Sequence, residues 1–395
     1  MTISTLSFQT QALAQMDALE TALSRTQTQL STGKKLQSAA DGPVAMAQVN
    51  ALGTQLSASR QEVSNGQAVA TSLQLEQGAL SNATNALQSA RDLAVEANNS
   101  DLSATDRQAL ATQLQQLEQS LLAAANSQDA QGNYLFGGTA SGAPPFAAGA
   151  GAVSYLGNDQ VNQVQIGADQ SVSVSDAGST VFMNLPAGNG TFTTAVGAGN
   201  TGNASIDPGS IRSPAAWVAD TYTLAFSSAT QYQLTNSAGA VVASGSYVSG
   251  DSIAFDGAEV TVSGTPAAGD QFTIAPAGRA SVFATIGNLI ATLNSTSLSS
   301  AQITTRIGGA LRQIDTALGH IDDVQAAVGG RLNAISAAAA SAQSEQTSLQ
   351  GSISTLADVD YAAAVTQLST QELALQAAQQ SYASIEKLSL FNYIS

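Results

Sequence analysis

Apolar residues recur with heptad spacing in both halves of the chain, around a middle section of different character. Isoleucine or valine repeats every seven residues at Ile307, Ile314, Ile321, Val328 and Ile335. Leucine fills the second position of that stripe at Leu311, Leu318 and Leu332, and Gln325 is its polar break. The earlier half carries stripes at Leu73, Leu80 and Leu87 and at Leu110, Leu114, Leu117 and Leu121. Heptad stripes bury themselves against partner helices, so we predict that the two halves pack together as the core of a helical rod.

The two ends of the chain carry thinner apolar stripes with uncharged surroundings. The first consists of Leu13, Met16, Leu23 and Leu30, and the second of Leu368, Leu375, Tyr382, Ile385, Leu388 and Phe391. A lone pair of such helices is marginally stable in water. We therefore predict that these residues form contacts between subunits and become ordered on assembly.

Helix boundaries are marked by local signals. Gly33 indicates a helix end, and Pro43 suits the first turn of a new helix, where its missing N–H costs nothing. Ser103 and Asp106 stand at the spacing of a capping box. A Ser/Thr-rich turn at 294–300 interrupts the later helical half, and Asp358 is placed to cap a last helix.

The middle section is rich in Gly, Ser, Thr and Val and alternates like β-strands. Its clearest signal is Asp256-Gly257 between two alternating runs, which predicts a hairpin. Further runs begin at Tyr222 and Tyr232, and Gln271–Ile274 reads as a closing strand. We predict an α+β fold, in which a long helical coiled-coil or bundle rod built from both chain ends carries an inserted β-rich domain. The expected domains are an N-terminal helix (1–40), the N-terminal part of the rod (41–139), the β-rich insertion (140–278), the C-terminal part of the rod (279–355) and a C-terminal helix (356–395).

The composition is typical of a protein whose surface is covered by neighbouring molecules. Charged residues make up 10% of the chain, against roughly 25% in typical soluble proteins. The net charge is −16, and Lys34-Lys35 is the only adjacent basic pair. Nucleic-acid contacts need clusters of Lys and Arg, so we expect no nucleic-acid partner.

The chain contains no cysteine, which excludes disulfides and thiolate chemistry. Residues 1–30 lack the apolar stretch of a secretory leader, and no run reaches the ~18 apolar residues of a membrane span. We expect no membrane insertion and, if the protein leaves the cell, export without a cleaved leader.

The residues that could support catalysis or ligand binding lack the neighbouring groups that such a site requires. His320 is the only histidine and lies between seam residues without a nucleophile at a useful spacing. Gly197–Gly202 spells GxGxxG, but no helical pattern follows it. The pairs Asp322/Asp323 and Asp358/Asp360 fit helix caps and solvated faces better than metal sites. We expect no catalytic residue, no cofactor and no metal, and hence no enzyme.

The ends of the chain resemble the flagellin superfamily. Leu30–Leu36 and Ser38–Pro43 are similar to its N-terminal signature, although Gly42 replaces the second acidic residue that usually precedes the proline. This departure affects the local charge contact and not the helix start. Within the superfamily, Ser103–Arg107, Asn126–Thr139, Asp358–Tyr361 and Leu388–Tyr393 resemble the hook–filament junction branch, the hook-associated protein 3 family. The resemblance covers about 1–140 and 280–395.

The resemblance implies a non-enzymatic structural adaptor of the bacterial flagellum. Such a protein forms a layer of its own copies between hook-associated protein 1 and the flagellin filament, joined through coiled-coil packing of the terminal helices. It is exported by the flagellar type III apparatus, with a chaperone on the C-terminal helix, and acts outside the cell in motility.

Two other functions stay open. One is a filament flagellin, although the ending Phe391-Asn392-Tyr393 differs from the tail typical of filament subunits. The other is a secreted adhesin or enzyme housed in the middle domain. A metalloprotease insert needs H-E-x-x-H, which a single histidine cannot supply. The sequence leaves open the topology and any ligand of the middle domain, the number of subunits, glycosylation and the face that meets each partner.

Overall fold

The computed structural model describes residues 2–99, 102–149 and 152–394, and the side chains of residues 7, 9–99, 102–149 and 152–384. Its helices are α1 (Thr2–Thr32), α2 (Pro43–Ala97), α3 (Ala104–Ala125), α4 (Val282–Asn294), α5 (Ser300–Ala357) and α6 (Tyr361–Ile394), with short turns at Ala39–Asp41, Ser179–Met183 and Pro214–Ala216. The chain divides into two compact units. The terminal unit comprises 1–64 and 338–395, and the central unit comprises 65–337, so α2 and α5 contribute to both.

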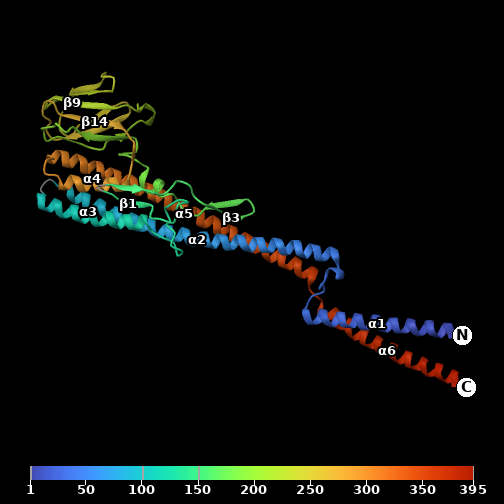
Figure 1. Cartoon of the computed structure of the whole chain (residues 1–395). Helices are drawn as coiled ribbons and strands as arrows, with labels where there is room; N and C mark the ends of the chain where they lie inside the picture. The colour runs from blue at the N-terminus through green and yellow to red at the C-terminus, as the bar shows by residue number, and fades with distance from the viewer. Residues whose placement is uncertain (1, 100–101, 150–151, 395) are drawn as a thin grey trace. The chain divides into compact units, whose positions relative to one another are not determined.

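In the central unit, α2, α3, α4 and α5 lie side by side (Figure 1). Their seam buries these apolar side chains almost completely: Leu73, Leu80, Leu87, Leu114, Leu121, Ile307, Ile314, Ile321, Val328 and Ile335. The structure places the other expected rod-core residues, Leu311, Leu318 and Leu332, at half-buried positions. Each of them follows a buried isoleucine or valine by four residues, which is slightly more than one turn of 3.6 residues. They therefore lie at the edge of the buried stripe and not at its centre.

Apolar burial is the main stabilising term of this seam. Full burial of a leucine or isoleucine side chain contributes about 1.5–3 kcal/mol. The polar contacts across the seam are weaker. Arg91 Nε donates to Asp315 Oδ1 at 2.6 Å, but both side chains are substantially exposed, and such pairs are worth roughly 0–1 kcal/mol. Gln325 Nε2 donates to Thr84 Oγ1 at 3.5 Å, so the polar break in the stripe has a partner across the seam.

The predicted helix starts are confirmed, with one correction. Helix α2 begins at Pro43, and Ser103 with Asp106 forms a capping box at the start of α3. The prediction for Asp358 is wrong, because its carboxylate pairs with Lys34 instead. Asp360 takes the capping position, and its Oδ1 accepts from the N–H groups of Ala362 and Ala363 at 3.0 and 3.2 Å.

The inserted region is β-rich, as predicted, and its largest part is a pair of packed sheets. Its strands are β1 (Phe146–Ala148), β2 (Val153–Tyr155), β3 (Gln163–Gly167), β4 (Gln170–Ser173), β5 (Leu185–Pro186), β6 (Phe192–Val196), β7 (Ser205–Ile206), β8 (Ser210–Ile211), β9 (Tyr222–Ser228), β10 (Gln231–Thr235), β11 (Val241–Ser246), β12 (Ser252–Phe255), β13 (Ala258–Ser263), β14 (Gln271–Pro276) and β15 (Arg279–Ala280). One sheet has the antiparallel order β11-β10-β9-β14-β6. In the other, β13 pairs with β12, β7 and β8.

The two sheets share one core. Alternate residues of β9, β13 and β14 are buried, as expected when one face of each strand packs inward. Tyr222, Phe226, Val260 and Phe272 belong to this core. The predicted hairpin is confirmed: Asp256 and Gly257 both have positive φ between β12 and β13, which a two-residue turn of this kind requires.

A short neck joins the part of the insertion that holds the two packed sheets (187–278) to the helices. Strand β5, on the way out, pairs with β15 on the way back. Beside it, Phe182 contacts Phe136 edge-on with ring centroids 5.2 Å apart, and Phe146 contacts Phe283 of α4 at 5.4 Å. This aromatic cluster fixes the base of the insertion on the helical part of the central unit.

A buried carboxyl interrupts the apolar seam of α2. Glu76 is fully buried, three residues after Leu73 and four before Leu80. Its Oε1 accepts from Asp176 N–H at 3.0 Å, and its Oε2 has no partner. Asp176 in turn pairs with Arg331 of α5. Burial, and then the charge of Asp176, raises the pKa of Glu76 to about 8.

The protonation of Glu76 predicts how stability depends on pH. The folded chain keeps this proton up to about pH 8, whereas the unfolded chain loses it near the ordinary pKa of 4.5. The free energy of unfolding should therefore fall as pH rises from about 4.5 to about 8, by at most about 1.4 kcal/mol per pH unit from this group. Urea unfolding followed by circular dichroism at several pH values measures the slope.

Glu76→Gln should flatten this slope, because the amide is neutral at every pH. Glu96→Gln, on an exposed position of the same helix, is the matched control and should keep the wild-type slope. Equal slopes for wild type and Glu76→Gln would contradict the assignment.

Candidate assembly surface on the terminal helices

In the terminal unit, α1 lies beside α6, with the two chain ends at the same end of the pair (Figure 1). The less exposed positions of α1 recur with alternating spacings of three and four residues. The stripe consists of Gln9, Ala12, Met16, Leu19, Leu23, Thr26 and Leu30, and Ala22 and Gln29 beside it are half-buried as well. This spacing is that of a coiled-coil seam, and we infer that the stripe faces α6.

Helix α6 carries the matching stripe. The stripe consists of Ala364, Leu368, Gln371, Leu375, Ala378 and Tyr382, again three and four residues apart, and Ala374 beside it is half-buried as well. Only Ala364 among them is fully buried. A single partner helix covers one side of each seam, so the larger side chains remain partly in water.

The residues expected to contact other subunits are distributed unevenly over this pair. Met16, Leu23, Leu30, Leu368, Leu375 and Tyr382 lie on the seam within the chain. Leu13 is off the seam and 44% exposed. The side chains of Ile385, Leu388 and Phe391 lie outside the described residues. Two apolar residues that the sequence reading left out, Val365 and Leu373, are exposed on α6 at 51% and 68%.

A clasp of backbone and side-chain bonds joins the chain segments at the base of this pair. Lys35 N–H donates to Ala357 C=O at 2.7 Å, and Val359 N–H donates to Gly33 C=O at 3.0 Å. Lys34 Nζ lies 2.5 Å from Asp358 Oδ1. The hydrogen bond from Lys34, followed by that from Ser354, lowers the pKa of Asp358. The breaks after α1 and before α6 are therefore tied to each other.

The segment between α1 and α2 is organised around the one acidic residue that remains in the signature. Asp41 Oδ2 accepts from the N–H groups of Gln37 and Ser38 at 3.0 and 2.8 Å. Its Oδ1 lies 2.5 Å from Arg25 NH2. These backbone bonds, the one from Gln37 first, lower the pKa of Asp41. Asp41 thus makes a charge contact without an acidic residue at position 42.

Candidate chemical groups elsewhere have structural roles. His320 Nε2 lies 2.9 Å from Thr180 C=O. The GxGxxG segment follows β6 and leads to β7 rather than to a helix, and the N–H groups of Thr201 and Gly202 donate to Asp270. Within the described ranges, no group of three or more His, Cys, Asp or Glu side chains is placed to hold a metal ion. No helix of the described chain has the length and hydropathy to cross a membrane.

Three sequence families match the chain. The bacterial flagellin N-terminal helical region matches residues 3–141, and the bacterial flagellin C-terminal helical region matches 311–394. The D2-like domain of flagellar hook-associated protein 1 matches 196–276. This last match covers the two packed sheets except for most of β6.

Individual relatives agree with these families. The chain is 30% identical to flagellar hook-associated protein 3 of Escherichia coli (strain K12) over 157 residues, or 40% of this chain and 49% of the relative. The match thus spans about half the length of that curated relative. The crystal structure of FlgL from Xanthomonas campestris is 33% identical, with a TM-score of 0.71 over 76% of this chain and 99% of that one. Flagellar hook associated protein-3 from Legionella pneumophila is 34% identical, with a TM-score of 0.72 over 78% and 98%.

The clasp predicts a cost for adding a side chain at Gly33. Gly33 has φ +71°, and a Cβ there would lie 3.0 Å from the Tyr361 hydroxyl. Gly33→Ala should weaken the clasp by about 1–2 kcal/mol, because L-residues disfavour this backbone region. Hydrogen exchange in α1 and α6 should become faster.

Gly53→Ala is the matched control in the same unit. Gly53 is helical, and a Cβ there meets no atom within 4 Å, so alanine should stabilise α2 by up to about 1 kcal/mol. Unchanged exchange in Gly33→Ala would show that the clasp does not hold the terminal helices.

Proposed function

Because this chain belongs to the family of the flagellar junction protein FlgL, also called hook-associated protein 3, we propose that it is the structural adaptor between the hook and the filament of a bacterial flagellum. Its relatives are flagellar components, and the flagellum is where the chain belongs.

The observation that supports an adaptor is the incomplete burial of the terminal helices. Helices α1 and α6 cover one side of each other, and Val365 and Leu373 remain exposed on α6. Charges are sparse along both helices. Such a surface is stabilised when further helices cover it.

The proposed partners of this surface are copies of the same chain, hook-associated protein 1 on one side and flagellin on the other. In this arrangement, Leu13, Met16, Leu23, Leu30, Leu368, Leu375, Tyr382, Ile385, Leu388 and Phe391 contribute to the inner coiled coil of a layer. Before assembly, an export chaperone holds the C-terminal helix, and the protein is then exported from the cell. Covering exposed apolar helices in this way prevents aggregation before the partners are reached.

Deletion of the gene tests the junction role. Electron microscopy should show hooks without filaments, and monomeric flagellin should accumulate in the medium. Missing filaments without shed flagellin would instead make this chain the filament subunit. Normal filaments would contradict the proposal.

Leu375→Asp tests the terminal coil. A charge placed on the half-buried seam should abolish filament attachment in the complemented deletion strain, while the β-rich insertion stays folded by Trp217 fluorescence. Gln376→Asp, at the neighbouring exposed position, is the matched control and should assemble normally. Filaments at wild-type number in the Leu375→Asp strain would contradict a role for this seam.

A further inference from the structure

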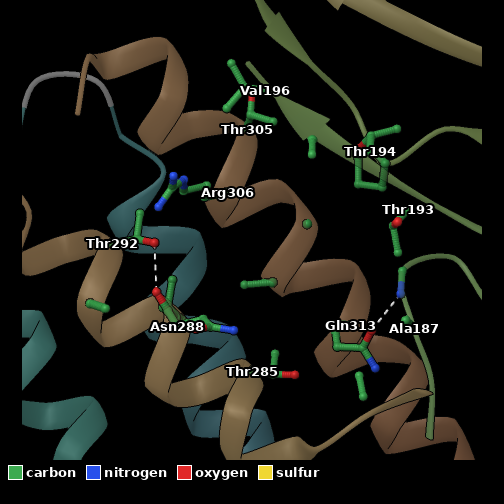
Figure 2. Close-up of a pocket in the computed structure, with 18 residues that line it drawn as sticks. Ala187, Thr193, Thr194, Val196, Thr285, Asn288, Thr292, Thr305, Arg306 and Gln313 are labelled. Carbon is green, nitrogen blue, oxygen red and sulfur yellow. Dashed lines mark hydrogen bonds between the residues drawn. The ribbon is translucent and has the colours of Figure 1, made fainter. Parts of the chain in front are cut away.

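A cleft of about 450 Å³ lies in the central unit between the edge strand β6 and helices α4 and α5 (Figure 2). Small residues of α5, Gly309 and Ala310, form the bottom of the cleft and leave it deep. A Cβ at Gly309 would meet no atom within 4 Å. Ala195, Val196 and Leu289 add apolar surface. The cleft therefore has room for a side-chain knob from another molecule.

Several polar groups around the cleft already have partners within the chain. Gln313 Oε1 accepts from Gly188 N–H at 2.6 Å, and its Nε2 donates to Pro186 C=O at 3.0 Å. Thr305 Oγ1 accepts from Ile206 N–H at 3.2 Å. These groups shape the cleft and are occupied.

Arg306 is different. Its side chain lines the cleft, and in the view of Figure 2 it extends from α5 toward α4. It is exposed and takes part in none of the ion pairs of the described residues, which engage Arg25, Lys34, Arg91, Arg212 and Arg331. An exposed guanidinium beside an apolar hollow favours a carboxylate carried next to an apolar side chain.

Helix α2 presents that chemistry on its exposed face. Val95 is 52% exposed, and Asp92 and Glu96 are exposed beside it. The chain has 28 acidic and 12 basic residues, so each copy presents an excess of carboxylates to the exposed arginine of its neighbour. Charge complementarity therefore favours a second copy of this chain as the occupant.

The two surfaces lie at the same level of the helical layer. Ala97 and Asn98, just after the acidic face, line a small pocket together with Ile303 and Thr304, just before Arg306. A lateral contact between two different faces at one level is heterologous, and repetition of it produces a ring or a helical layer.

We propose that the cleft receives the Asp92/Val95/Glu96 face of α2 from a neighbouring copy of this chain, with Arg306 pairing to its carboxylates. The inference rests on the proposed function, because it names a contact between copies within the junction layer.

Charge reversal in the full chain, expressed in the deletion strain, tests the pairing. Arg306→Glu alone and Glu96→Arg alone should each lower the number of copies per flagellum about tenfold or more, because each places like charges at the contact. The double variant should restore incorporation. Arg312→Glu, an exposed arginine of α5 outside the cleft, is the control and should incorporate normally. Normal incorporation of Arg306→Glu, or failure of the double variant to recover, would overturn the proposal.

Cross-linking identifies the occupant. The chain has no cysteine, so Val95→Cys combined with Ala310→Cys should give a ladder of linked copies on oxidation of isolated flagella, whereas Val95→Cys with Gly319→Cys should not. A link to another flagellar protein, or no ladder from incorporated protein, would overturn the second copy as occupant while leaving the junction role intact. Absence of the wild-type chain from flagella would overturn the proposed function, and this inference with it.

Discussion

Burial of one apolar seam, contributed by the two halves of the chain, is the constraint on which the rest of the structure depends. Leu80 and Leu87 come from α2, and Ile307 and Ile321 from α5, more than two hundred positions later. Neither half can bury its stripe alone. The pairing closes a long loop, which costs entropy that grows only slowly with loop length. A large insertion between the halves is therefore tolerated, and both chain ends emerge together to form the α1/α6 pair.

Heptad periodicity and turn chemistry made the architecture predictable from the residues. The helix start at Pro43, the capping box at Ser103 and the hairpin at Asp256-Gly257 follow from local rules that no distant contact overrides. The β-rich character of the insertion followed from alternation. The order of its strands did not, because β14 pairs with β6 and β9, and strand neighbours separated by many residues leave no local trace.

The features that sequence reasoning missed are all long-range. Glu76 is buried among the seam residues of α2, and its environment comes from Asp176 and Arg331. Asp358 resembled a helix cap until the fold placed Lys34 beside it. For the terminal helices, periodicity identified which residues form a stripe. It could not decide whether a stripe meets its own chain or another, because the spacing required is the same for both.

The neck formed by β5 and β15 has a consequence for how this chain could diversify. Everything from Ala187 to Gly278 leaves and returns through one two-stranded ribbon. Replacement of that stretch would keep the two attachment points beside each other, but it would remove the hydrogen bonds from Gly188 and Ile206 to α5. Change within this module is thereby largely separated from change in the helical framework. Surface variation can therefore accumulate on the strands of the insertion that do not line the cleft at β6.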